Sequence, residues 1–212
     1  MRTTITIARQ LGSGGTYLGQ VIAKRFGLKY IDREVVHQCA EEFGYDEQEL
    51  AARQERVSSF WERFWQDLSL GRAEVPYIPP PLRPLSDKEL FDKQTEIMKQ
   101  LAGETDCVIV GYGGSHLLAH HEGKVNIFCH APRSFRIKRV MELYHAGTED
   151  EALRMIQESD EMRKRYFMEM TGRDWACAEI YHLSIDTSLL PLDEIAEMLT
   201  QLLKRKGITE KT

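Results

Sequence analysis

The sequence has few cysteines, and their spacing does not fit a metal site. Four cysteines are spread over 212 residues, without a C-x-x-C pair or a cysteine–histidine cluster. A cysteine-based metal or redox centre is therefore not expected. Cys107 and Cys129 lie in apolar runs typical of strands, which predicts that both are small core residues.

Long apolar runs and an excess of positive charge are also absent. No stretch is long enough for a transmembrane helix and no signal peptide is visible, so we expect a cytoplasmic protein with no membrane partner. Lys and Arg number 28 against 33 Asp and Glu, which gives a net charge of −5. This balance argues against nucleic acid as a partner and requires any anion site to be local.

Glycine, by contrast, is concentrated in a loop near the start of the chain. Residues 3–7 alternate and β-branch as a strand does, and residues 17–26 carry apolar side chains at helical spacing. The sequence from Arg9 to Thr16 reads R-Q-L-G-S-G-G-T. A strand, a glycine-rich loop and a helix in this order hold phosphate, because the loop N–H groups and the helix N-terminus point at the anion. A glycine-rich turn without a ligand is the alternative.

The loop lacks the lysine of the P-loop pattern, G-x-x-x-x-G-K-[ST]. In an alignment on Gly14 and Thr16, Arg9 takes the place of the first glycine and Gly15 the place of the lysine. Arg9 or an arginine from another segment would then supply the missing charge. A side chain at Gly14 would obstruct the approach of phosphate. The predicted phosphate-binding residues are Gly12, Ser13, Gly14, Gly15 and Thr16, with the Thr16 hydroxyl also a ligand of magnesium.

The remainder of the chain predicts a single α/β domain. Five strands separated by helical segments predict a five-stranded parallel sheet with helices on both faces. Residues 46–86 form an insertion that contains an aromatic stripe, over residues 60–68, and five of the seven prolines. The stripe is either a packing face or the contact of a homodimer. The four strands expected after the first are 28–31, 106–111, 124–130 and 181–186.

Charged residues follow two of the predicted strands. Asp32 and Arg33 come directly after strand 28–31, at the edge where α/β sheets bind ligands. Asp32 also fits the cap of a following helix. Basic residues gather in the helices after strand 124–130, as either a phosphate-binding surface or a solvated helix face. These residues are Arg133, Arg136, Lys138, Arg139, Arg163, Lys164 and Arg165.

Together these segments resemble the cytidylate kinase-like family, a branch of the nucleoside monophosphate kinases in the P-loop superfamily. The resemblance is carried by I-T-I-A-R-Q-L-G-S-G-G-T, V-I-V-G-x-G-G, D-E-M-R-K-R-Y-F and Y-H-L-S-I-D-T-S. It covers residues 3–45 and 87–203, and the family has R-Q-x-G-S-G-G in place of a loop with lysine. The resemblance implies a core sheet, a monophosphate-binding segment after the second strand, and a basic helical lid within 132–174.

The implied activity is ATP-dependent phosphoryl transfer to a pyrimidine nucleoside monophosphate, CMP or dCMP. ATP and Mg²⁺ are the implied cofactors, and nucleotide substrates are the implied partners. The implied site residues are Arg9, Arg133 and Arg163 for catalysis, Asp32, Arg33 and Tyr112 for the monophosphate, and Arg136, Asp160 and Arg165 in the lid.

Two departures from the family pattern favour a different function. Tyr112 stands where the family has an arginine after the glycine of the third strand, and no carboxylate ends this strand to hold magnesium. The alternative is a nucleotide-binding regulatory protein with weak or no turnover.

Overall fold

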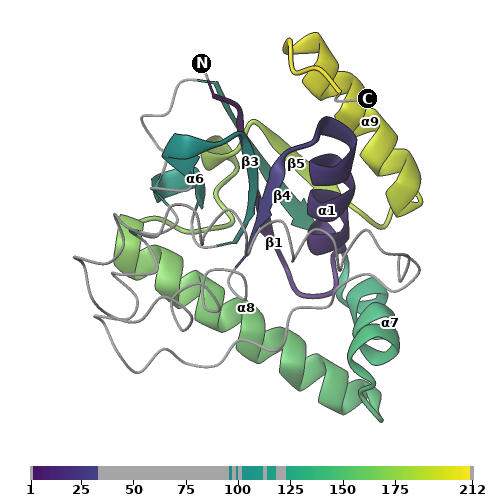
Figure 1. The fold of residues 1–212 in the computed structure, drawn as a ribbon. Helices are drawn as coiled ribbons and strands as arrows, with labels where there is room; N and C mark the ends of the chain where they lie inside the picture. Colours follow the sequence, from purple (N-terminus) through teal and green to yellow (C-terminus); the bar gives the residue numbers. More distant parts are fainter. Residues whose placement is uncertain are drawn as a thin grey trace, which may run out of the picture.

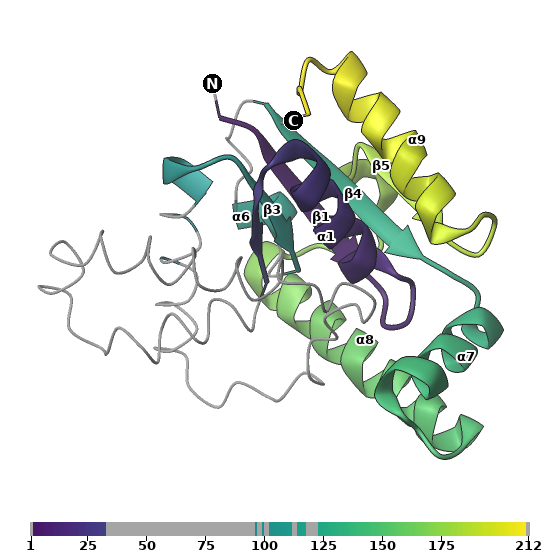
Figure 2. The same ribbon diagram turned by 45° about the vertical axis from the view of Figure 1, so that its right-hand side comes forward.

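The computed structural model describes residues 2–32, 96, 99, 102–111, 114–117 and 123–210. Within these residues, five parallel strands form one sheet in the order β2-β3-β1-β4-β5. The predicted five-stranded parallel sheet is therefore confirmed, with the first strand at its centre (Figure 2). The strands are β1 (Thr4–Arg9), β2 (Lys29–Ile31), β3 (Cys107–Val110), β4 (Lys124–His130) and β5 (Leu183–Asp186).

Helices cover both faces of the sheet. One face carries α1 and α9, and the other carries α6 and the end of α8 (Figure 1). Phe167 of α8 lies in one cluster with Phe128 of β4. The loop between β1 and α1 lies at the end of the sheet nearest α7 in both views (Figures 1 and 2). The helices are α1 (Gly15–Phe26), α6 (Gly114–Leu117), α7 (Arg133–Tyr144), α8 (Glu149–Thr171) and α9 (Leu192–Arg205).

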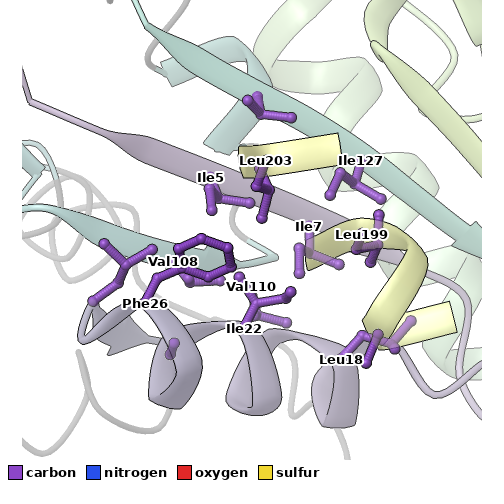
Figure 3. Packing of buried hydrophobic residues seen from close by; sticks show 14 of the residues in the cluster. Ile5, Ile7, Leu18, Ile22, Phe26, Val108, Val110, Ile127, Leu199 and Leu203 are labelled. Atoms are coloured by element: carbon purple, nitrogen blue, oxygen red, sulfur yellow. The ribbon is translucent and has the colours of Figure 1, made fainter. Parts of the chain in front are cut away.

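The layer between the sheet, α1 and α9 is aliphatic. Ile5 and Ile7 of β1 point toward Ile22 and Leu18 of α1, while Leu199 of α9 packs in the same cluster (Figure 3). Their side chains are at most 1 % exposed. Full burial of an aliphatic side chain of this size stabilises the fold by about 1.5–3 kcal/mol. The layer therefore fixes β1 against α1 and, with them, the two ends of the glycine loop.

The segment before β5 differs from the prediction. The strand expected at 181–186 begins at Leu183, because residues 178–180 form a short 3-10 turn. Tyr181 is held elsewhere: its ring stacks on Phe128 at 5.0 Å and its hydroxyl donates to the Trp175 carbonyl at 2.6 Å. Tyr181 therefore belongs to an aromatic cluster on the second face of the sheet and not to β5.

Other expected elements match closely or lie outside the described residues. Helix α8 begins at Glu149 because Thr148 caps its first turn by accepting the Glu151 N–H. Residues 102–104 are helical. Arg33, Tyr112 and the insertion 46–86 with its aromatic stripe lie outside the described residues.

His182 joins β4 to the start of β5 in its neutral form. Its ring Nδ1 accepts the backbone N–H of Asn126 at 2.8 Å, and the backbone N–H of His182 donates to the Asn126 carbonyl at 2.8 Å. Partial burial, with smaller effects from the charges of Lys206 and Lys124, lowers the pKa of His182 from its ordinary value of 6.5. Protonation of Nδ1 would replace this acceptor by a second donor.

The lowered pKa of His182 predicts a loss of stability in mild acid. Below pH 6.5 the unfolded chain takes up a proton at His182 more readily than the folded chain does. The contribution of neutral His182 to the free energy of unfolding is therefore complete above pH 6.5 and is lost as the pH falls through the folded pKa. We expect the unfolding temperature of wild type to fall more than that of His182→Gln between about pH 7.5 and 5.5. Equal slopes for the two proteins in matched buffers would contradict this assignment.

Candidate functional site

The loop between β1 and α1 is held in one conformation from several sides. Gly12 and Gly14 both have φ of 80°, a region that glycine adopts without strain. The Ser13 hydroxyl donates to the Gln10 carbonyl at 2.8 Å. Thr187, just after β5, donates its hydroxyl to the Ser13 carbonyl at 2.6 Å. The loop is therefore shaped by β5 as well as by its own ends.

The first turn of α1 presents free N–H groups to the loop. Gly14 is the N-cap, no side chain caps the helix, and its first turn contains no acidic residue. Leu18 is the first residue whose N–H bonds back along the helix, to the Gly14 carbonyl at 3.1 Å. The N–H groups of residues 15–17 therefore have no partner within the helix. Together with the positive end of the helix dipole, they make a site suited to an anion.

Gly14 has a packing role that the sequence does not reveal. A Cβ at this position would approach a methyl carbon of Leu192, in α9, to 2.7 Å. This contact adds a second consequence of a side chain here, beside the predicted obstruction of phosphate. The positive φ favours glycine, and a larger residue would also have to displace the Leu192 side chain.

Arg9 ends β1 and runs beneath the loop between two glycines. Its side chain is largely buried, with the residue 8 % exposed. A Cβ at Gly15 would lie 2.6 Å from the Arg9 Cβ, and a Cβ at Gly111 would overlap the Arg9 Nη1. The stem of Arg9 thus lies against the start of α1, and its guanidinium reaches the end of β3.

Two further side chains lie close to Arg9. Burial, reinforced by the charge of Arg9, lowers the pKa of Arg163, in α8. Burial raises the pKa of Tyr144, at the end of α7, and the charges of Arg9 and Arg163 oppose this rise. The charge of Arg9 therefore acts on both groups, each of which is partly exposed. Two guanidinium groups this close repel each other unless an anion joins them.

A single carboxylate ties the helices α7 and α8 to the loop. Asp160 accepts the Leu11 N–H at 2.9 Å and the Arg163 Nη1 at 3.1 Å on Oδ1, and the Arg136 Nη1 at 2.5 Å on Oδ2. Arg136 also donates from Nε to the Ala131 carbonyl at 3.1 Å and from Nη1 to the Leu11 carbonyl at 3.3 Å. We call Asp160, Arg136 and Leu11 the loop brace.

Positive charge exceeds negative charge around the brace. In the part of the chain that the structure describes, Arg136 and Arg163 both pair with Asp160, and Arg9 pairs with no carboxylate. Two guanidinium groups therefore share one carboxylate, and that of Arg9 adds a third positive charge beside the free N–H groups of α1. A polyphosphate carries the charge and the acceptor oxygens that such a cluster lacks.

Four other predicted site residues differ in how exposed they are. Asp32 is fully buried at the end of β2, and Thr16 is partly exposed in the first turn of α1. Arg133 and Arg165 are exposed on α7 and α8. The structure thus joins Arg9, Arg136, Asp160 and Arg163 to the glycine loop.

Sequence reasoning missed two residues of the site. Tyr144 ends the basic helix, where nothing in the pattern distinguishes it from a core aromatic residue. Thr187 belongs to the I-D-T-S stretch after the last strand, and its bond to Ser13 spans 174 residues of chain. No local spacing connects either residue to the loop.

The central β1, the glycine loop and the uncapped α1 are arranged as in the fold of P-loop kinases. Solved structures with the same fold include a gluconokinase from Sinorhizobium meliloti, at a TM-score of 0.53 and 16% identity over 97% of this chain and 94% of that one. A shikimate kinase from Acinetobacter baumannii has a TM-score of 0.51 and 13% identity, over 99% and 97%. An uncharacterized protein from Eubacterium ventriosum has a TM-score of 0.67 and 19% identity, over 96% and 99%.

Within this class, the sequence places the chain more narrowly. The sequence profile of the cytidylate kinase-like family matches residues 4–189, and the chain belongs to this family. A cytidylate kinase from Sulfolobus acidocaldarius is 26% identical over 113 residues, which span 53% of this chain and 61% of that protein. Among the described helices, none combines the length and the apolar character that crossing a membrane requires.

Proposed function

We propose that the protein transfers the γ-phosphoryl group of ATP to a pyrimidine nucleoside monophosphate, CMP or dCMP. The observation that carries this proposal is the excess of arginine charge, from Arg9 and Arg163, beside the free N–H groups of α1. Membership of the cytidylate kinase-like family and the similarity to a cytidylate kinase support the choice of acceptor.

The donor would lie in the glycine loop. The N–H groups of residues 15–17 fit the β-phosphate, since they have no partner within α1. Thr16 would hold Mg²⁺ together with phosphate oxygens and water, as P-loop proteins do. This ion would neutralise charge on the phosphates. Among the described residues no cluster of three or more His, Cys, Asp or Glu side chains competes for the metal.

Phosphoryl transfer makes few demands on the protein beyond position and charge. A phosphate oxygen of the acceptor bonds to the γ-phosphorus as the bond to the β–γ bridging oxygen breaks, and ADP leaves. Negative charge then grows on the bridging oxygen, and buried guanidinium groups stabilise it. Arg9 and Arg163 would supply this charge, while Arg136 and Asp160 hold the loop. Arg133 and Arg165, exposed on the lid helices, would reach the phosphates when the lid closes.

The acceptor would bind at the ends of β2 and β3. Asp32 directly follows β2 as a buried carboxylate, at the edge of the sheet where ligands bind in this class of fold. We assign Arg33 and Tyr112 to the same acceptor site on the resemblance to the family. The proposal further places the protein in the cytoplasm with its nucleotide substrates, and assigns the stripe at 60–68 to a homodimer contact.

Asp32→Ala is expected to raise the KM for the acceptor and to leave ATP binding nearly unchanged. The carboxylate lies at the end of β2, whereas the donor loop follows β1. Steady-state kinetics with the acceptor varied, and calorimetry with ATP alone, separate the two effects. Equal losses in acceptor KM and ATP affinity would contradict the acceptor role.

A panel of acceptors tests the function directly. CMP, dCMP, UMP, AMP, GMP, shikimate and gluconate are each offered with ATP and Mg²⁺, and ADP and the phosphorylated product are measured. We expect CMP or dCMP to give the highest kcat/KM. A preference for AMP or a sugar acid would overturn the assignment.

A second candidate is a nucleotide-binding regulatory protein, favoured by the glycine in place of the P-loop lysine. It predicts that ATP raises the unfolding temperature, since a ligand of the folded state stabilises it, while no acceptor is phosphorylated.

A further inference from the structure

Two departures from the P-loop pattern occur at positions that touch each other. The pattern has glycine where this chain has Arg9, and lysine where it has Gly15. A Cβ at Gly15 would lie 2.6 Å from the Arg9 Cβ and 3.2 Å from its Cγ. Carbon atoms that are not bonded do not approach this closely, so this backbone accepts a side chain at position 9 or at position 15, and not at both.

This contact makes the two departures one exchange. In the usual pattern, glycine at the end of the strand leaves room for the lysine at the start of the helix. Here the side chain starts from the strand, and the helix position is glycine. The basic side chain is therefore at position 9 in this chain and at position 15 in the usual pattern. In both cases the pair contains one basic residue and one glycine.

We propose that Arg9 is the relocated P-loop cation, which binds the β- and γ-phosphates of a nucleoside triphosphate. The proposal deepens the function above and rests on it only in taking such a triphosphate as the ligand. Three placements of the side chain support it. The stem lies against the first residue of α1, the guanidinium reaches the end of β3, and Arg163 is close enough for its pKa to respond to the charge.

The charge of Arg9 is also left without a counter-charge in the described part of the chain. Asp160, which pairs with Arg136 and Arg163, makes no ion pair with Arg9. A largely buried guanidinium in this position is stabilised by an anion that brings its own charge. Its planar fork offers two parallel N–H donors, so one residue can contact two phosphate oxygens. Arg9→Lys should therefore bind ATP more weakly than wild type and more tightly than a variant without charge at position 9.

Four variants test the exchange. Arg9→Met keeps an unbranched stem against Gly15 and removes only the charge. Arg9→Gly and Gly15→Lys are the single changes, and Arg9→Gly combined with Gly15→Lys recreates G-x-x-x-x-G-K-T. In the combined variant the nearest remaining contact of the new Cβ is the Cys129 Cβ at 3.2 Å, which a shift of a few tenths of an ångström relieves. Arg154→Ala, an exposed change on α8, is the control for loss of one charge.

Affinity for ATP by calorimetry and the unfolding temperature are measured for each protein. We expect Arg9→Met to weaken ATP binding by about 10- to 100-fold with little change in unfolding temperature. Gly15→Lys should unfold at a lower temperature because of the clash. The combined variant should be more stable than Gly15→Lys and should bind ATP more tightly than Arg9→Gly, a non-additivity typical of residues in contact.

The proposal is overturned if Arg9→Met binds ATP as wild type does, or if the combined variant is no better than the single ones. Absence of ATP binding by wild type overturns it as well. Failure of the proposed function gives another result: wild type binds ATP and phosphorylates no acceptor. The affinities of the variants still decide the role of Arg9 in that case.

Discussion

Arg163→Ala is expected to lower kcat by roughly 10³-fold while leaving the unfolding temperature unchanged or slightly higher. An arginine that meets the transferred phosphoryl group contributes on this scale, because charge grows there during the reaction. Stability should not suffer, because the partly buried Arg163 experiences the like charge of Arg9. Asp160 retains the Leu11 N–H and Arg136 as partners after the change.

The measurement is kcat at saturating ATP and acceptor, together with thermal unfolding without ligand. Arg154→Ala, exposed on the same helix, removes the same charge away from the loop and should retain the wild-type kcat. Normal turnover by Arg163→Ala would remove this residue from the catalytic group. A large fall in its unfolding temperature would show that the guanidinium stabilises the fold instead.

Asp160→Ala should produce the opposite pattern, with the main loss in stability. The change leaves Arg136, whose side chain is 9% exposed, without its counter-charge and the Leu11 N–H without its acceptor. Breaking a buried pair in this way costs about 3–5 kcal/mol. For a chain of this size, that loss lowers the unfolding temperature by roughly 6–20 °C.

Thermal unfolding of Asp160→Ala is compared with that of Glu158→Ala, an exposed carboxylate on the same helix, which should unfold close to wild type. Asp160→Asn should lie between the two, because its amide oxygen still accepts one donor. ATP affinity should also fall in Asp160→Ala, since the loop has lost its connection to α8. Unchanged stability in Asp160→Ala would show that the brace contributes little.

Local sequence patterns predicted the elements that depend on neighbouring residues. Strand 124–130 agrees with β4 because its apolar run is bounded by Gly123 and by Pro132. The glycine loop is predictable for the same reason, since strand, loop and helix follow one another directly. The strand before Asp186 was only partly predictable, because the aromatic side chain of Tyr181 fits a strand and a packed cluster equally well.

Contacts between distant segments could not be predicted. The Asp160 bond to Leu11 spans 149 residues, and the sequence around Asp160 fits an exposed helix face as well as a brace. The contact between Gly14 and Leu192 was also hidden, because Leu192 lies in the last helix. For Arg9, the sequence gives the missing lysine and a candidate replacement. The exchange with Gly15 becomes visible only when the distance between the two positions is known.

The Thr187 bond to Ser13 has a consequence for protein synthesis. The loop belongs to the first sixteen residues, yet one of the bonds that shapes it comes from a residue 174 positions later. While the chain is being made, the loop leaves the ribosome long before β5 and α9 exist. A nascent chain that stops before residue 187 holds the glycines without this bond from Thr187. Nucleotide should therefore be captured late in synthesis, and truncated translation products should not sequester it.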